Sequence, residues 1–245
     1  MTRQICWLLS LLLLAGCRLD AQVDVAVDGD GGGTLAVVLA ADERLRDAAA
    51  EAGADPLAAL VRTGRELEGW QVTRSQAADG AVTLSTRFDD AGELERVSAD
   101  LAAGLTAPEV APLGPLRLTV ADETIALDGT AGLRMSAAVA ELGLNPARAR
   151  ARLADGLRYR ITARMPGRVL RTNADDQPDA RTAVWSIVPG ERRVLQVTAE
   201  RPWTLERLMA YLIESQTLTV LVGGVLLAVA LRRQPPDLLG AARPR

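Results

Sequence analysis

Two acidic doublets, Asp89-Asp90 and Asp175-Asp176, are the residues of this chain whose type and spacing come nearest to catalysis. Paired carboxylates can act as general acid and base, as in glycoside hydrolysis, when they face each other across a cleft. Neighbours in sequence do not supply that geometry, and both doublets stand where a turn or a helix N-cap favours aspartate. We therefore expect backbone roles for them and assign no catalytic residue.

The rest of the composition narrows the chemistry further. The chain has no histidine and no lysine, because all 28 basic residues are arginine. This excludes an imidazole general base, Ser–His and Cys–His pairs, a Schiff-base lysine and the lysine of a P-loop. It also removes histidine as a metal ligand, and two cysteines alone cannot build a zinc site. The composition thus excludes most enzyme classes and leaves only carboxylates, Tyr, Ser and Thr for chemistry, and we expect no metal or cofactor.

Cys17 closes a segment that is typical of an export signal. Arg3 makes the start positive, residues 5–14 form an apolar run too short to span a bilayer comfortably, and small residues precede the cysteine. The Leu-Ala-Gly-Cys ending at 14–17 resembles the lipobox of bacterial lipoproteins, whose cysteine is diacylated and becomes the first mature residue. We therefore expect residues 1–17 to be a lipoprotein signal peptide and Cys17 to be the lipidation site. A secretory signal with a chance cysteine is the alternative.

Residues 208–231 are the second candidate for membrane attachment. The stretch 217–231 carries no charge, and extension toward about 20 residues gives about 30 Å of helix, the thickness of a bilayer core. Trp203 precedes it at the level where aromatic rings favour headgroups, and an arginine pair at 232–233 follows it. We expect a transmembrane helix, a cytoplasmic tail over 232–245 and an exported body. A buried core helix is the alternative.

The residue pattern of the exported body predicts an α+β fold of antiparallel sheets with two or three helices. Apolar and polar residues alternate over 19–27, and a Gly-rich turn leads to a second strand over 34–40. The turn's Asp-Gly-Asp-Gly is similar to half of a calcium loop but lacks the distant glutamate, so we expect a hairpin turn. The other expected elements are helices over 42–51, 55–67, 91–103 and 146–154, strands over 70–76, 81–88, 116–120, 123–127, 130–138, 157–165, 181–188 and 192–200, and tight turns at 121–122 and 128–129.

Residues 107–115, rich in proline, form the clearest linker in the body. We place a boundary there, between exported sub-domains at 18–112 and 113–203. Charge also changes along the body, since residues 18–145 hold 10 arginines against 22 acidic residues, whereas 146–211 hold 13 against 7. The basic half is therefore the half beside the expected span. The sequence leaves open whether the two sub-domains share one core.

Eight arginines of the basic half are candidates for contact with lipid headgroups. Each arginine near an anionic membrane contributes about 1 kcal/mol of attraction, and an ordinary solvated face is the alternative interpretation. Nucleic acid is not an expected partner, because the body is exported and acidic overall. The eight candidates are Arg148, Arg150, Arg152, Arg158, Arg160, Arg164, Arg168 and Arg171.

Two segments carry a resemblance to a known family. One runs from Cys17 through the alternating strand and Gly-rich hairpin to Phe88-Asp89. The other begins with Arg160-Ile-Thr-Ala-Arg-Met-Pro-Gly-Arg-Val-Leu-Arg-Thr-Asn173 and continues through Ala183-Val-Trp-Ser186 to Pro189-Gly-Glu191. Together they resemble the LppM-type lipoproteins of actinobacteria and relatives. That family combines a lipobox, an α+β exported domain, a Pro-Gly-x-Val…Asn-Gly…Val-x-Trp hairpin and a C-terminal membrane helix.

The hairpin of this chain departs from that pattern at its tip. Ala174 replaces the glycine after Asn173, and Asp-Asp-Gln-Pro-Asp occupies residues 175–179. From the residues themselves we expect structural roles, with two β-turns and Trp185 packed beneath the hairpin.

The resemblance implies a cell-envelope location and no established enzymatic activity, with lipid or glycolipid as the favoured ligand. The leading hypothesis is a lipoprotein tethered at both ends that binds lipid or glycolipid at the membrane surface. The alternative is an envelope assembly or scaffold protein whose exported domain binds another protein. Expected partners are therefore membrane lipids, a glycolipid or another envelope protein.

Overall fold

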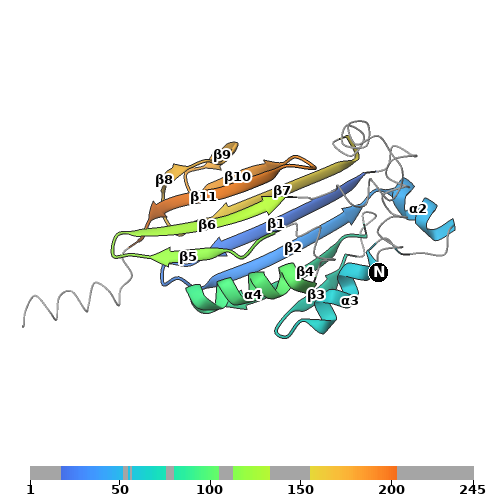
Figure 1. Cartoon of the computed structure of the whole chain (residues 1–245), viewed down its shortest axis with the longest axis horizontal. Helices are drawn as coiled ribbons and strands as arrows, with labels where there is room; N and C mark the ends of the chain where they lie inside the picture. The colour runs from blue at the N-terminus through green and yellow to red at the C-terminus, as the bar shows by residue number, and fades with distance from the viewer. Residues whose placement is uncertain are drawn as a thin grey trace, which may run out of the picture. The chain divides into compact units, whose positions relative to one another are not determined.

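Two β-sheets and three helices make up the described part of the chain, which in this computed structural model comprises residues 18–51, 55, 57–75, 80–104, 113–132 and 155–202 (Figure 1). The larger sheet has the strand order β3-β4-β2-β1-β7-β10-β9, and the smaller has the order β5-β6-β11-β8. The strands are β1 (Leu19–Val27), β2 (Gly33–Ala41), β3 (Gln71–Arg74), β4 (Val82–Phe88), β5 (Arg117–Val120), β6 (Thr124–Gly132), β7 (Leu157–Arg164), β8 (Val169–Thr172), β9 (Asp176–Asp179), β10 (Thr182–Ile187) and β11 (Arg192–Glu200), and the helices are α2 (Glu43–Glu51), α3 (Ala58–Glu66) and α4 (Ala91–Gly104).

The larger sheet is mixed, not purely antiparallel as expected. Strand β1 pairs antiparallel with β2 and parallel with β7, in a register that sets Leu19 opposite Leu157 and Ala26 opposite Arg164. A parallel neighbour requires a crossover connection, and here that connection comprises most of the domain. The α+β class is confirmed, with one parallel pair at the centre of the larger sheet.

The two expected sub-domains share one core. Strands β1 to β4 precede the linker and β7, β9 and β10 follow it, yet all seven belong to the same sheet. Buried apolar residues from both sides form a single cluster, in which Trp185 and Phe88 are the largest fully buried side chains. The body up to Pro202 is accordingly one compact unit.

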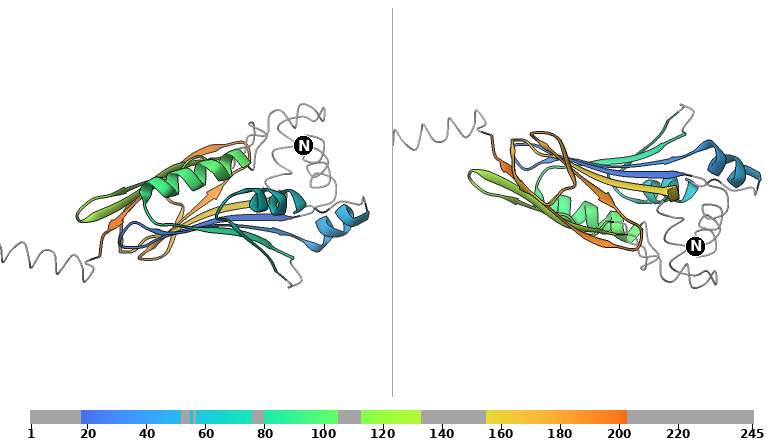
Figure 2. Two further views of the ribbon diagram at one scale, coloured as in Figure 1. Left: turned by 90° about the horizontal axis from the view of Figure 1, so that it is seen from below. Right: turned by 90° about the horizontal axis from the view of Figure 1, so that it is seen from above.

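The core lies between two layers, and one face of the larger sheet carries no described helix. Figure 2 shows the smaller sheet and α4 on one side and the larger sheet on the other. Helix α4 buries Leu94, Val97 and Leu101, which recur at helical spacing on one face. The Ser98 hydroxyl is fully buried and accepts a hydrogen bond from the Leu116 N–H (2.8 Å), which joins α4 to the start of the smaller sheet.

The Gly-rich segment between β1 and β2 is a hairpin turn, as expected. The Asp28 N–H donates to the Gly32 carbonyl (2.8 Å), and the Asp30 carboxylate accepts from the Gly32 N–H (3.2 Å). Gly31 has a φ of 98°, a conformation that favours glycine.

The turn expected at Asp128-Gly129 is absent, because β6 continues through it as one strand paired with β11. A Cβ on Gly129 would stand 2.6 Å from Cδ2 of the buried Leu116. The glycine therefore serves close packing and not chain reversal.

Most other elements agree with expectation to within two residues, but β8 and β9 were not expected. The helix at 146–154, the signal peptide at 1–17, the span at 208–231 and the tail at 232–245 lie outside the described residues. None of the described helices has the length and apolar character needed to cross a bilayer.

Candidate functional site

Strand β7 presents a row of arginines on the uncovered face of the larger sheet. Arg158, Arg160 and Arg164 are exposed, whereas the intervening Tyr159, Ile161 and Ala163 are buried. The basic strand face predicted from the alternation is therefore present. None of the three guanidinium groups forms an ion pair with a carboxylate of the described residues.

Strand β1 adds negative charge to the same face. Its register with β7 sets Asp20 opposite Arg158 and Asp24 opposite Thr162. Asp24 is also engaged within its own strand, since the Gln22 side-chain amide donates to both of its oxygens (2.8 and 3.0 Å). On the other side of β7, Asp179 of β9 pairs with Thr182 beside Arg164. The face around β7 therefore combines three arginines with three neighbouring aspartates.

A shallow depression of about 460 Å³ lies where β7 begins and β10 ends. Its lining combines two guanidinium groups, Arg158 and Arg160, with the Ser186 side chain and the apolar Val188, which is 45% exposed. Burial raises the pKa of the Tyr159 hydroxyl, so this group stays protonated at neutral pH. Cationic and apolar surfaces side by side suit an anionic group joined to a less polar body.

The other predicted headgroup residues are not part of this cluster. Arg168 forms an ion pair with Glu200 (2.8 Å), and Arg171 is exposed on β8 in the smaller sheet. Arg148, Arg150, Arg152 and the lipidation candidate Cys17 lie outside the described residues. The structure thus brings together three of the eight predicted arginines.

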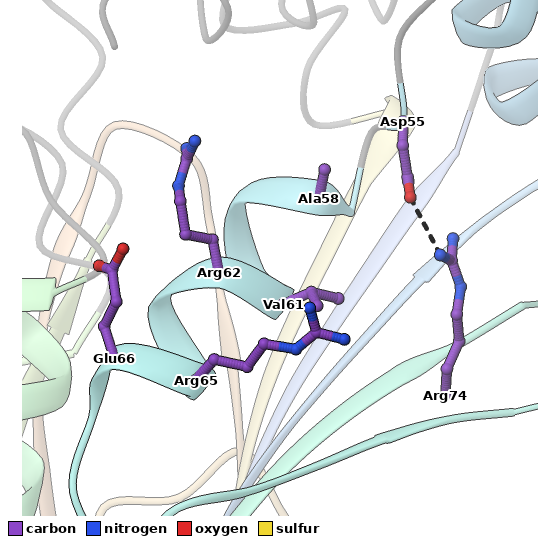
Figure 3. A pocket seen from close by; sticks show the side chains of 7 residues that line it. All are labelled: Asp55, Ala58, Val61, Arg62, Arg65, Glu66 and Arg74. Atoms are coloured by element: carbon purple, nitrogen blue, oxygen red, sulfur yellow. Dashed lines mark hydrogen bonds and ion pairs between the residues drawn. The ribbon is translucent and has the colours of Figure 1, made fainter.

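A second depression of about 350 Å³ lies beside α3 (Figure 3). Arg62 and Arg65 extend from successive turns of the helix, and Arg74 of β3 is tied to Asp55 (3.0 Å). Two carboxylates, Asp55 and Glu66, therefore accompany three arginines in this lining. This site was not predicted, although the spacing of Arg62 and Arg65 places both on one helix face.

Asn173 connects the two sheets, a role that sequence reasoning missed. Its Oδ1 accepts hydrogen bonds from Trp185 Nε1 (2.8 Å) in β10 and from the Gln196 N–H (2.9 Å) in β11. Its Nδ2 donates to the Val194 carbonyl (2.9 Å). The predicted packing of Trp185 is confirmed, because its side chain is fully buried. The signal that could have revealed Asn173 is its position within the Pro-Gly…Trp motif.

Both acidic doublets have the backbone roles predicted for them. Asp90 accepts a hydrogen bond from the Glu93 N–H (2.8 Å), and Glu93 accepts from the Asp89 N–H (2.8 Å), which together cap α4. Asp175 accepts from the Ser186 N–H (2.8 Å) and pairs with Arg193 (2.6 Å).

These bonds also set the protonation of Asp175. Burial alone would raise the pKa of this carboxyl, but the Ser186 hydrogen bond and the Arg193 guanidinium outweigh it and lower the pKa. Asp175 therefore stays ionised well below neutral pH.

The fold and the surface define a two-sheet α+β domain that exposes an arginine-bearing strand. The chain belongs to the LppM family, because the LppM domain matches residues 18–201, as the hairpin motif predicted. It is also similar to the NMR structure of the folded domain of Mycobacterium tuberculosis LppM, with 16% identity and a TM-score of 0.45 over 77% of this chain and 92% of that one. A comparison with curated proteins found no match.

Proposed function

We propose that the protein is a non-enzymatic envelope lipoprotein whose LppM domain binds the anionic headgroups of lipid or glycolipid. In this proposal Cys17 carries the lipid anchor, residues 208–231 span the membrane and the body is extracytoplasmic. The observation that carries the proposal is the row of Arg158, Arg160 and Arg164 on a sheet face that no described helix covers. Membership in a lipoprotein family supports the envelope location.

The row is suited to phosphate groups in a membrane. Guanidinium groups present several N–H donors in a planar fork that matches phosphate oxygens. Alternate residues of a strand repeat at about 6.6 Å, so neighbouring arginines can engage separate headgroups. The depression at Arg158 and Arg160 adds the exposed Val188, which can contact the less polar part of the same lipid.

The test is flotation of purified residues 18–202 with phosphatidylcholine vesicles, with and without phosphatidylglycerol. Combined replacement of Arg158, Arg160 and Arg164 by glutamine should weaken binding to the anionic vesicles by about 100-fold, at about 1 kcal/mol for each arginine. The matched control replaces Arg44, Arg96 and Arg117 by glutamine, which removes the same charge from exposed positions outside both depressions.

If the control variant loses as much binding as the triple β7 variant, the attraction depends on net charge alone and not on the arginine row. If the unmodified domain does not bind the anionic vesicles, the proposal is refuted. Cross-linking in intact cells tests the alternative, docking to another envelope protein. A single dominant protein adduct that persists in the triple β7 variant would favour that alternative.

A further inference from the structure

The two ends of the described domain lie at opposite ends of β1. Arg18 is held at the start of the strand, where its N–H donates to the Asp42 carboxylate (2.9 Å) and its carbonyl accepts from the Asp42 N–H (3.0 Å). Arg201 is held at the other end, where its guanidinium donates to the carbonyls of Gly29 (3.0 Å) and Ala121 (3.1 Å). Figure 1 shows the β5–β6 turn and the end of β11 together at that end.

This placement separates the two proposed membrane attachments. The strand Leu19–Val27 has a length of about 27 Å at about 3.3 Å per residue. Cys17 adjoins Arg18 directly, so an acyl anchor there holds the start of β1 at the membrane surface. At the other end only residues 203–207 separate the domain from the proposed span, and five extended residues reach about 18 Å at most.

A domain attached at both points to one membrane cannot stand upright. With one end of a strand of about 27 Å at the surface and the other raised by about 18 Å at most, β1 is inclined by at most about 40° to the membrane plane. Trp203, which favours the headgroup region, reduces this inclination further. The strands of the larger sheet therefore run roughly along the membrane.

Charge distinguishes the face that is turned to the bilayer. The uncovered face of the larger sheet carries Arg87, Arg158, Arg160 and Arg164 against Asp20 and Asp24, with Asp176 and Asp179 on edge strand β9. Arg158 and Arg160 lie at the end of β7 away from Asp179 and next to the start of β1. The exposed side of α4 is acidic, with Glu93, Glu95 and Asp100 against Arg96. Small residues such as Ala26, Ala36 and Ala40 alternate with buried ones on β1 and β2, and they leave the sheet face without large projections.

We infer that the domain lies flat on the membrane, with the uncovered face of the larger sheet against the lipid headgroups. This inference rests on the proposed function and adds an orientation to it. It also places the depression at Leu157–Arg160 next to the lipid anchor, because Leu157 pairs with Leu19, two residues from Cys17. A headgroup bound there belongs to a lipid that neighbours the acyl chains of the protein itself.

The experiment uses the full lipidated chain in phosphatidylglycerol-containing vesicles, with a fluorophore on one introduced cysteine and a headgroup-attached quencher. Acylation blocks Cys17, and the leader that contains Cys6 is removed. Ala40→Cys and Thr34→Cys label the uncovered face near opposite ends of β1, because Ala40 pairs with Asp20 and Thr34 with Ala26. Asp100→Cys labels the exposed side of α4, across the core, and packed sheets alone are about 10 Å apart.

We expect strong and similar quenching at Ala40→Cys and Thr34→Cys and a loss of quenching at Asp100→Cys. Quenching at Ala40→Cys alone would show an upright domain, and quenching mainly at Asp100→Cys would show the opposite face; either result overturns the orientation. The flotation experiment with residues 18–202 lacks both anchors. Its failure therefore refutes headgroup binding, whereas an upright domain that still floats refutes the orientation alone.

Discussion

Asn173→Ala tests whether one side chain holds the two sheets together. The substitution removes two acceptor interactions, to Trp185 Nε1 and to the Gln196 N–H, and one donor interaction, to the Val194 carbonyl. Trp185 is fully buried, so its indole N–H lacks an equivalent partner in the variant. Water can reach the two backbone groups beside the exposed Asn173, which lowers their share of the cost.

An unsatisfied buried donor costs about 1–3 kcal/mol, and each solvent-accessible hydrogen bond contributes about 0.5–1.5 kcal/mol. We therefore expect Asn173→Ala to lower the free energy of unfolding by about 3 kcal/mol. In a domain of this size the melting temperature should fall by about 6–12 °C. Asn173→Asp keeps an acceptor for Trp185 and Gln196 but loses the donor to Val194, so its effect should be smaller.

Urea unfolding of residues 18–202, followed by tryptophan fluorescence, measures these differences. The domain contains Trp70 and Trp185, and emission from Trp185 should shift to longer wavelength as its burial is lost. Gln177→Ala is the control, because Gln177 is exposed on edge strand β9, and it should change stability by less than about 0.5 kcal/mol. If Asn173→Ala changes the free energy of unfolding no more than the control does, the claim that Asn173 holds the two sheets together is refuted.

Two further predictions concern acid stability and packing. The folded-state pKa of Asp175 lies below its unfolded value of about 3.9, so the bonds of its carboxylate stabilise the fold above that pH and are lost as pH falls through the folded pKa. Asp175→Asn should therefore reduce the loss of stability below about pH 4. Urea unfolding across pH measures this, and an acid profile that the substitution leaves unchanged would contradict the prediction. Gly129→Ala should lower the free energy of unfolding by about 1–3 kcal/mol, because the added Cβ would clash with Leu116. The control Gly92→Ala, in the first turn of α4, should leave stability unchanged or raise it. The same unfolding assay measures both, and equal effects would show that Gly129 is not needed for packing.

The elements with strong periodicity could be predicted from the sequence. Alternation over 19–27 and 157–165 identified two strands and the faces they bury, and the three-to-four-residue spacing of Leu94, Val97 and Leu101 identified α4. These signals are local, since each strand or helix must bury one face whatever it packs against. The arginine face of β7 followed from the same alternation.

The features that were missed depend on distant partners. The parallel pairing of β1 with β7 cannot be recognised from either segment alone, because apolar and polar residues alternate in both as they do in antiparallel strands. Asp128-Gly129 has the composition of a turn, but pairing with β11 keeps it extended. Strand β9 is exposed along its whole length and contains Pro178, so it has no apolar pattern to detect. Asn173 acts through groups in two other strands.

The parallel pair at the centre of the larger sheet determines the order in which the chain can complete its fold. Leu19 pairs with Leu157, so about 140 residues must be synthesised after the start of β1 before its parallel partner β7 exists. At ribosomal rates this synthesis takes roughly 7–28 s. Until then β1 and β2 form a hairpin whose open edge is a template for pairing with other chains. Fragments that end before β7 should therefore expose this edge and aggregate, whereas a chain that includes β7 covers it.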